Sequence, residues 1–229
     1  MGTTADKLQA ILDSKAAIKT AINSVNNALT DSTPLDEYAG QIDDNIASIF
    51  NKTMISIDKT DITFLQNYQF FQHTQLISVN LPNVTTLGTS GYEFSGCTSL
   101  QSIVLGSITT PNNFATVNFC TDCSSLTSIT FGDYYGQLGA NSFKNCSSLQ
   151  SINLKRITAI NGAAFSGCTS LQSITIENTG NCTLSNVNAI PTGQNITIYV
   201  PSSKVSWYQA ASNWTTLYQN GDVTFSAIV

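Results

Sequence analysis

The stretch FSGCTSLQSIVL at residues 94–105 decides the fold, because close copies of it return along the chain. FKNCSSLQSINL occupies residues 143–154, and FSGCTSLQSITI occupies residues 165–176. A shorter copy, CSSLTSITF, begins at Cys123, and Phe119 precedes it one residue further back than in the other copies. Repetition this close indicates that one structural unit is built several times over.

Two weaker copies extend the array. FFQHTQLISVNL occupies residues 70–81, and a last copy is placed with Ile190 at the cysteine position. The cysteine position then recurs every 22 to 26 residues, which predicts a leucine-rich repeat solenoid. In each unit Leu-x-x-Ile-x-Leu directs three apolar side chains inward from a short strand, and the next rung repeats them about 4.8 Å away. A single unit cannot bury this face, so several must stack.

The side chains that alternate with the inward ones are expected to face solvent, where amides and hydroxyls form a polar surface. These candidate ligand contacts are Gln101, Val104, Thr130, Gln150, Asn153, Gln172 and Thr175. Two adjacent tyrosines, Tyr134 and Tyr135, lie between Gly132 and Gly136 and cannot both point inward. We include both as candidates, because an exposed tyrosine suits recognition.

Charge is scarce and unevenly distributed. Only 10% of residues are Asp, Glu, Lys or Arg, against roughly 25% in an ordinary domain. Stacked repeats align equivalent residues, so a charge in the repeat would lie beside copies of itself, whereas serines can hydrogen-bond one another. The nine basic residues are scattered and the net charge is −5, which argues against nucleic-acid binding. No apolar run reaches the roughly 18 residues of a membrane-spanning helix.

The first 50 residues have a different pattern. Apolar residues at heptad positions predict a helix that either packs in a helical hairpin with residues 35–49 or forms an oligomeric coiled coil. Lys15 interrupts the stripe. The proposed oligomerisation residues are Leu8, Ile11, Ile18, Ile22, Val25 and Leu29. The acidic start of the chain lacks the basic and apolar regions of a signal peptide, so we expect no conventional secretion signal.

The repeat F-x-x-C-[TS]-S-L-x-S-I-x-[LI] resembles the BspA-type (Treponema pallidum-like) leucine-rich repeats over about residues 64–200. The resemblance extends through Trp207 and Trp214, a segment similar to the end of many such arrays. It implies surface adhesion and binding of proteins or glycans, and it implies no catalysis. The chain is therefore expected to be α+β, with a helical hairpin or coiled coil at 1–50, a solenoid at 51–200 and a capping helix and strand at 201–229.

The reactive residue types favour a structural interpretation. Four cysteines (Cys97, Cys123, Cys146 and Cys168) share one repeat position, which predicts a column of buried thiols. The Cys120-x-x-Cys123 pair has no second pair to complete a zinc site, and the role of Cys182 is left open. His73, the only histidine, falls on the cysteine position and is interpreted as a buried or half-buried spacer. We therefore expect neither enzymatic activity nor a bound cofactor or metal.

Three functions fit these features. The first is a phage virion protein, a fibre, tail or capsid-surface component attaching to a host protein or glycan. Its N-terminal helices would contact other virion proteins or form a homo-oligomer. This hypothesis joins adhesive repeats to the missing signal peptide and to an N-terminal pattern at residues 7–42 that resembles gut-phage structural proteins. The second is a bacterial cell-surface adhesin, and the third is an intracellular protein-binding scaffold.

Overall fold

The computed structural model describes residues 55–109 and 117–228, which belong to one compact unit, Thr53–Val229. The helices expected in residues 1–50, together with the six proposed oligomerisation residues, lie outside the described residues. The described residues of the segments expected at 51–200 and 201–229 belong to that unit.

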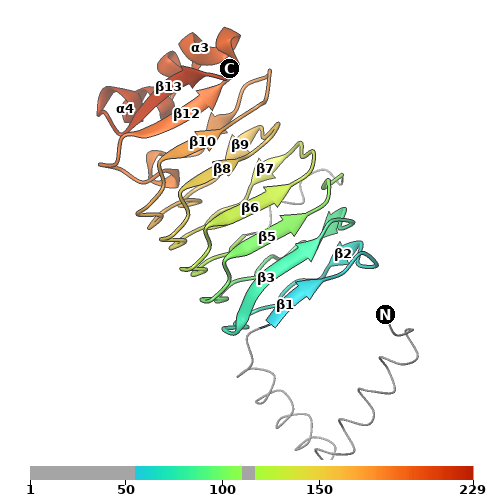
Figure 1. Ribbon diagram of the computed structural model, residues 1–229. Helices are drawn as coiled ribbons and strands as arrows, with labels where there is room; N and C mark the ends of the chain where they lie inside the picture. Colours follow the sequence, from blue (N-terminus) through green and yellow to red (C-terminus); the bar gives the residue numbers. More distant parts are fainter. Residues whose placement is uncertain (1–54, 110–116, 229) are drawn as a thin grey trace, which may run out of the picture. The chain divides into compact units, whose positions relative to one another are not determined.

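Long parallel strands follow one another in chain order along one side of the solenoid (Figure 1). They form two four-stranded sheets, with the order β1-β3-β5-β6 and β8-β10-β12-β13. The first contains β1 (Ile55–Asp58), β3 (Leu76–Leu81), β5 (Ser102–Leu105) and β6 (Ser128–Phe131). The second contains β8 (Ser151–Asn153), β10 (Ser173–Thr175), β12 (Ile196–Val200) and β13 (Val223–Ala227).

A second set of very short parallel strands forms another side of the rungs. One pair joins β2 (Phe64–Leu65) to β4 (Thr86–Leu87). Three further strands pair with one another, namely β7 (Gln137–Leu138), β9 (Ala159–Ile160) and β11 (Thr183–Leu184). The predicted leucine-rich repeat fold with parallel strands is therefore confirmed for the described residues, which contain few helices.

The register of the long strands stacks equivalent repeat positions on one another. Ser102 and Ile103 lie opposite Ser128 and Ile129, as the repeat predicts. The isoleucines at this position are buried, and alternate residues along each strand are more exposed. This alternation lets one face of each strand supply the core while the other face remains available to solvent.

A column of phenylalanine rings runs through the core beside the strands. Consecutive ring centroids lie between 5.2 and 6.1 Å apart; the first and last pairs are stacked, and the two middle pairs make edge-to-face contacts. The column consists of Phe70, Phe94, Phe119, Phe143 and Phe165, all of them buried. Aromatic pairs in these geometries contribute roughly 0.5–1.5 kcal/mol beyond the burial of their surface.

Each turn needs residues that tolerate left-handed backbone. The residue before the cysteine position has a positive φ in every repeat from 72 to 167, and it is glycine in two of them. At Gly167, where φ is +80°, an added Cβ would lie 2.3 Å from Asn145 Oδ1. Glycine is therefore favoured there by the backbone angle and by the close approach of the Asn145 side chain from the preceding rung.

The C-terminal segment covers the last rung. Two short helices, α3 (Val205–Ala210) and α4 (Trp214–Gln219), precede β13, which pairs with β12 (Figure 1). Trp214 and Tyr208 are fully buried and both rings contact Phe225 of β13. Two 3-10 turns, Val187–Ala189 and Ser202–Lys204, flank β12. Burying these aromatic rings closes the end of the core, as solenoids require.

Candidate functional site

Seven candidate residues lie on or directly before the long strands. Val104, Thr130, Asn153 and Thr175 alternate with buried core residues, whereas Gln101, Gln150 and Gln172 each lie one residue before a strand. Four are exposed and three are half-buried. In the first sheet Val104 lies opposite Thr130, and in the second Asn153 lies opposite Thr175. The exposed members are Gln101, Thr130, Gln150 and Gln172, and the half-buried ones are Val104, Asn153 and Thr175. We call this set the strand face.

The two adjacent tyrosines point in opposite senses, which corrects one candidate. Tyr134 is only 2% exposed and its hydroxyl donates to the carbonyl of Gln137 at 2.7 Å, so it belongs to the core rather than to an open binding surface. Its ring also contacts Phe131. Tyr135 is 62% exposed, the largest exposure among the large hydrophobic side chains of the described residues.

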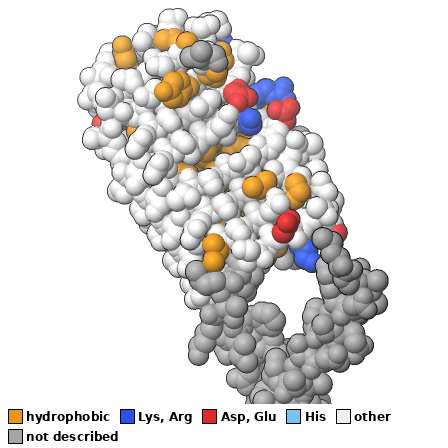
Figure 2. All heavy atoms as spheres, viewed as in Figure 1, with side chains coloured by type: hydrophobic (Ala, Val, Ile, Leu, Met, Phe, Trp, Pro, Cys, Tyr) orange, Lys and Arg blue, Asp and Glu red, His pale blue; other side chains and the backbone are white. Residues whose placement is uncertain are grey.

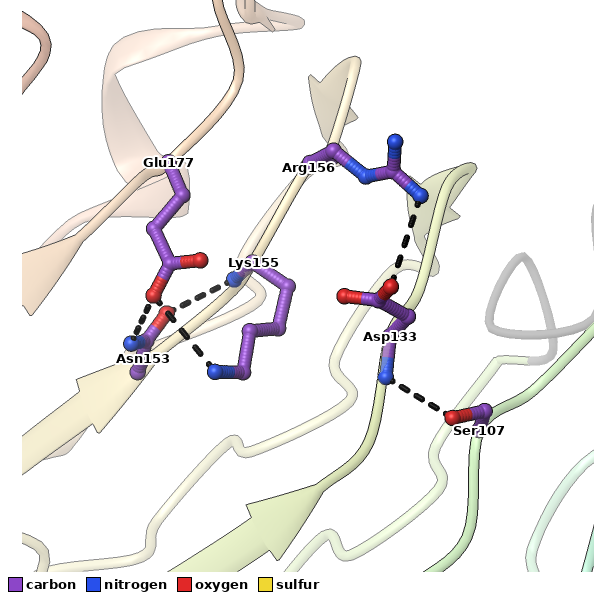
Figure 3. A network of polar contacts seen from close by, with 6 residues as sticks. All are labelled: Ser107, Asp133, Asn153, Lys155, Arg156 and Glu177. Atoms are coloured by element: carbon purple, nitrogen blue, oxygen red, sulfur yellow. Dashed lines mark hydrogen bonds and ion pairs between the residues drawn. The ribbon is translucent and has the colours of Figure 1, made fainter.

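A group of charged residues lies just beyond the ends of β6, β8 and β10, and sequence reasoning did not single it out. Lys155 Nζ lies 3.4 Å from Glu177 Oε1, and Arg156 lies 3.7 Å from Asp133 Oδ2 (Figure 3). Asn153 joins the first pair, because its Nδ2 donates to Glu177 Oε1 at 2.6 Å. We call these residues the charged flank. In Figure 2 charged side chains gather along one flank, while most of the drawn surface is white.

The sequence contains a feature that could have indicated the charged flank. Asp133, Lys155, Arg156 and Glu177 all follow a repeat strand by two or three residues, so rung stacking brings them together. A shallow hollow of about 300 Å³ adjoins the flank and is lined by residues 107–109, 133–135 and Arg156.

The six cysteines are all buried and free. At the repeat position each thiol donates to a main-chain carbonyl of the preceding rung at 2.9–3.1 Å, in Cys97, Cys123, Cys146 and Cys168. Burial raises the pKa of the Cys97 thiol to about 12 and holds that of Cys146 well above its ordinary value. The predicted column of buried thiols is therefore confirmed, and at neutral pH these groups are protonated.

The irregular third unit accounts for Cys120. The amide of Phe94 donates to the carbonyl of Phe119, and in the next rung the amide of Cys120 donates to Ser142. Cys120 therefore occupies the backbone position of the repeat phenylalanine, one residue after Phe119. Its sulfur lies 3.1 Å from the Cys123 sulfur.

Contacts near the end of the solenoid place the last repeat and Cys182. The amide of Phe165 donates to the carbonyl of Ala189, so Ile190 occupies the phenylalanine position rather than the cysteine position expected from the sequence. Trp214 Nε1 donates to the carbonyl of Cys182 at 2.8 Å, which places buried Cys182 beneath the cap.

Two titratable residues, His73 and Glu93, differ in their burial. His73 is exposed, which corrects the expectation of a buried or half-buried spacer. Glu93 is fully buried, and neither carboxylate oxygen has a hydrogen-bond partner among the described residues. Burial raises the pKa of Glu93 to about 8. The loss of hydration disfavours the charged form, so Glu93 is mainly neutral at pH 7.

The described residues offer little for metal chemistry or membrane insertion. Within residues 55–109 and 117–228 no group of three or more His, Cys, Asp or Glu side chains is placed to hold a metal ion. In the same part of the chain no helix has both the length and the apolar character needed to cross a bilayer.

Comparison with known proteins identifies the repeat. A family model described as BspA type leucine rich repeat region, in six copies, matches residues 32–116, 63–183 and 105–211. No curated protein matches. A solved leucine-rich repeat protein from Bacteroides ovatus ATCC 8483 is similar, with a TM-score of 0.49 and 23% identity. The similarity covers 76% of this chain and 42% of the other, so the chain spans less than half of that protein. These comparisons find no catalytic family.

Proposed function

The chain belongs to the family of BspA-type leucine-rich repeat proteins, and on that premise we propose that it is a non-enzymatic adhesin of a bacterial cell surface. Proteins with these repeats are often found on bacterial surfaces, and leucine-rich repeats are generally protein-interaction modules. In this proposal the strand face holds a partner protein.

The observation that carries the proposal is the alignment of polar side chains across successive rungs. Thr175 of β10 lies between Asn153 of β8 and Tyr199 of β12, whereas Thr130 of β6 has the apolar Val104 of β5 beside it. Neutral amide and hydroxyl groups repeated at strand spacing favour an extended partner that makes many similar hydrogen bonds. Each such bond contributes only about 1 kcal/mol net, so affinity depends on their number.

Self-association would strengthen this weak binding. We propose that the heptad residues of the N-terminal segment, including Leu8 and Leu29, join several chains. Linking binding sites in this way can raise overall affinity by roughly 10²- to 10⁴-fold. Light scattering on the full chain and on a chain lacking residues 1–50 measures the oligomeric state, and a monomer in both samples would remove this part of the proposal.

The strand face is tested by charge substitution. Gln150→Lys with Gln172→Lys places two cations on it, whereas Gln137→Lys places a cation at the exposed residue of β7, on another side of the solenoid. Labelled full-length chain is applied to candidate target cells and bound fluorescence is measured. We expect the double variant to lose most binding and the Gln137→Lys control to retain it. Equal binding by both variants would contradict a role for the strand face.

Surface display is tested separately. Antibodies against the purified chain should label intact cells of the source bacterium, and protease added outside the cells should remove the label. The phage-virion hypothesis is the narrower alternative, and it rests on N-terminal residues 7–42, which lie outside the described residues. Recovery of the chain in purified phage particles by mass spectrometry, together with unlabelled intact cells, would favour the virion over the cell surface.

A further inference from the structure

The hollow beside the charged flank has features that the strand-face proposal leaves unused. It lies where the chain leaves β5 and β6, with Ser107, Thr109, Asp133, Tyr135 and Arg156 among its lining residues. Its volume of about 300 Å³ is at the lower end of the roughly 300–1,000 Å³ typical of small-molecule sites. The hollow therefore suits one or two small rings rather than a long chain.

The local backbone holds Tyr135 at the edge of this hollow. The hydroxyl of Tyr134 donates a hydrogen bond to the carbonyl of Gln137, which fixes Tyr134 in the core. A Cβ added to Gly136 would lie only 2.4 Å from the oxygen of this hydroxyl. Because Gly136 has no Cβ, the backbone can pass close to this hydroxyl. Tyr134 points into the core, and its neighbour Tyr135 faces outward. With 62% of its surface exposed, the Tyr135 ring offers an open aromatic surface.

Polar groups of both signs share the hollow with this ring. Arg156 and Asp133 lie 3.7 Å apart, and their side chains are 54% and 74% exposed, so much of their hydrogen-bonding capacity remains available. Ser107 Oγ accepts the amide hydrogen of Asp133 at 3.0 Å (Figure 3). Its own hydroxyl hydrogen can therefore be donated outward. The two opposite charges cancel, so the hollow carries no net charge.

From this arrangement we propose that the hollow is a binding site for a neutral saccharide unit. A sugar ring has one apolar C–H face, which would pack on the Tyr135 ring. Its hydroxyls both donate and accept hydrogen bonds. Asp133 can accept from one hydroxyl, and the Arg156 guanidinium and Ser107 hydroxyl can donate to others.

Other ligand classes match these groups less well. An anionic ligand that approaches Arg156 also meets the carboxylate of Asp133, so its net electrostatic attraction is small. A peptide could pack on the Tyr135 ring, but a hollow of about 300 Å³ accommodates only one or two of its side chains. A neutral sugar ring with several hydroxyls can pack on the Tyr135 ring and hydrogen-bond to both Asp133 and Arg156. This site is independent of the strand face.

The test is an amide NMR titration of the full chain. The probes are the methyl glycosides of glucose, galactose, mannose and N-acetylglucosamine, with glucuronate as an acidic probe and trialanine as a peptide probe. We expect at least one neutral glycoside to give saturable shifts at Ser107, Asp133 and Tyr135, with a Kd on the order of millimolar. Tyr135→Ala should weaken this binding at least about tenfold, and Arg156→Gln should weaken it severalfold.

A matched control separates local from general effects. Tyr199→Ala removes another exposed tyrosine, on β12 away from the hollow, and should leave saccharide binding unchanged. Unshifted amides elsewhere in each variant show that the fold is intact. Absence of saturable shifts with every neutral glycoside, binding that survives Tyr135→Ala, or saturation only with glucuronate or trialanine would each overturn the proposal. None of these results bears on cell binding through the strand face.

Discussion

Glu93 should make the stability of this protein depend on pH in a direction unusual for a carboxyl group. It is fully buried, and its two oxygens lack partners among the described residues. Burial raises its pKa to about 8 in the folded chain, against the ordinary value of 4.5 expected after unfolding. Between these two pH values the folded chain holds a proton that the unfolded chain has lost. Stability contributed by the neutral acid is therefore complete below pH 4.5 and falls as pH rises towards 8.

The size of the effect follows from that window. Each pH unit within it lowers the free energy of unfolding by up to about 1.4 kcal/mol, so the loss between roughly pH 5 and pH 7 is about 3 kcal/mol. Glu93→Gln keeps the shape of the neutral acid and cannot ionise, so its unfolding free energy should lose this pH dependence.

The measurement is urea unfolding followed by circular dichroism at several pH values across the window, on wild type and Glu93→Gln. We expect the variant to become progressively more stable than wild type as pH rises. Glu177→Gln, which removes a half-buried carboxyl paired with Lys155, is measured as the matched control. The only histidine, His73, is present in all three proteins and cancels in the difference. Parallel stability curves for wild type and Glu93→Gln would refute the reasoning.

Three further substitutions test the packing. Gly167→Ala should cost roughly 1–3 kcal/mol in urea unfolding, because its Cβ meets Asn145 at 2.3 Å in left-handed backbone; an unchanged midpoint would contradict this. Trp214→Phe should lower the thermal midpoint by leaving the buried carbonyl of Cys182 unpaired, at a cost of roughly 1–3 kcal/mol, and Trp207→Phe, at a half-buried position, is its control. Cys146→Ser should destabilise by about 1–3 kcal/mol in the same assay, because a buried hydroxyl is costlier than a thiol; strong zinc retention by wild type would instead contradict the thiol column.

Much of the fold could be predicted from the sequence, because a repeat fixes both the strand position and its neighbours. Once Ile103 and Ile129 hold equivalent places, parallel stacking puts one beside the other without further information. The burial of the cysteine column and the cap over the last rung follow from the same logic. The family resemblance is likewise confirmed.

The features that could not be predicted depend on loops of unequal length, because loop length decides which residue of one rung lies beside the next rung. Cys120 occupies the phenylalanine position, and the Phe119 ring still joins the column, because backbone bonds between rungs set the alignment rather than residue type. The pattern around Tyr134 allowed either tyrosine to face inward, and only the close approach of Gly136 to the Tyr134 hydroxyl decides which one does. The charged flank arises between repeats, where a single repeat gives no signal.

The identical register between β5 and β6 and between β8 and β10 has a consequence for how such a chain can change in length. A new unit copied from its neighbour would meet on both sides the same isoleucine, serine and phenylalanine contacts that the original meets. The gene could therefore gain or lose whole units without redesigning any junction, while Trp214 and its helices continue to seal the end. Reach and binding strength would then grow in discrete steps, one rung at a time, and that makes this architecture easy to adapt to a different partner.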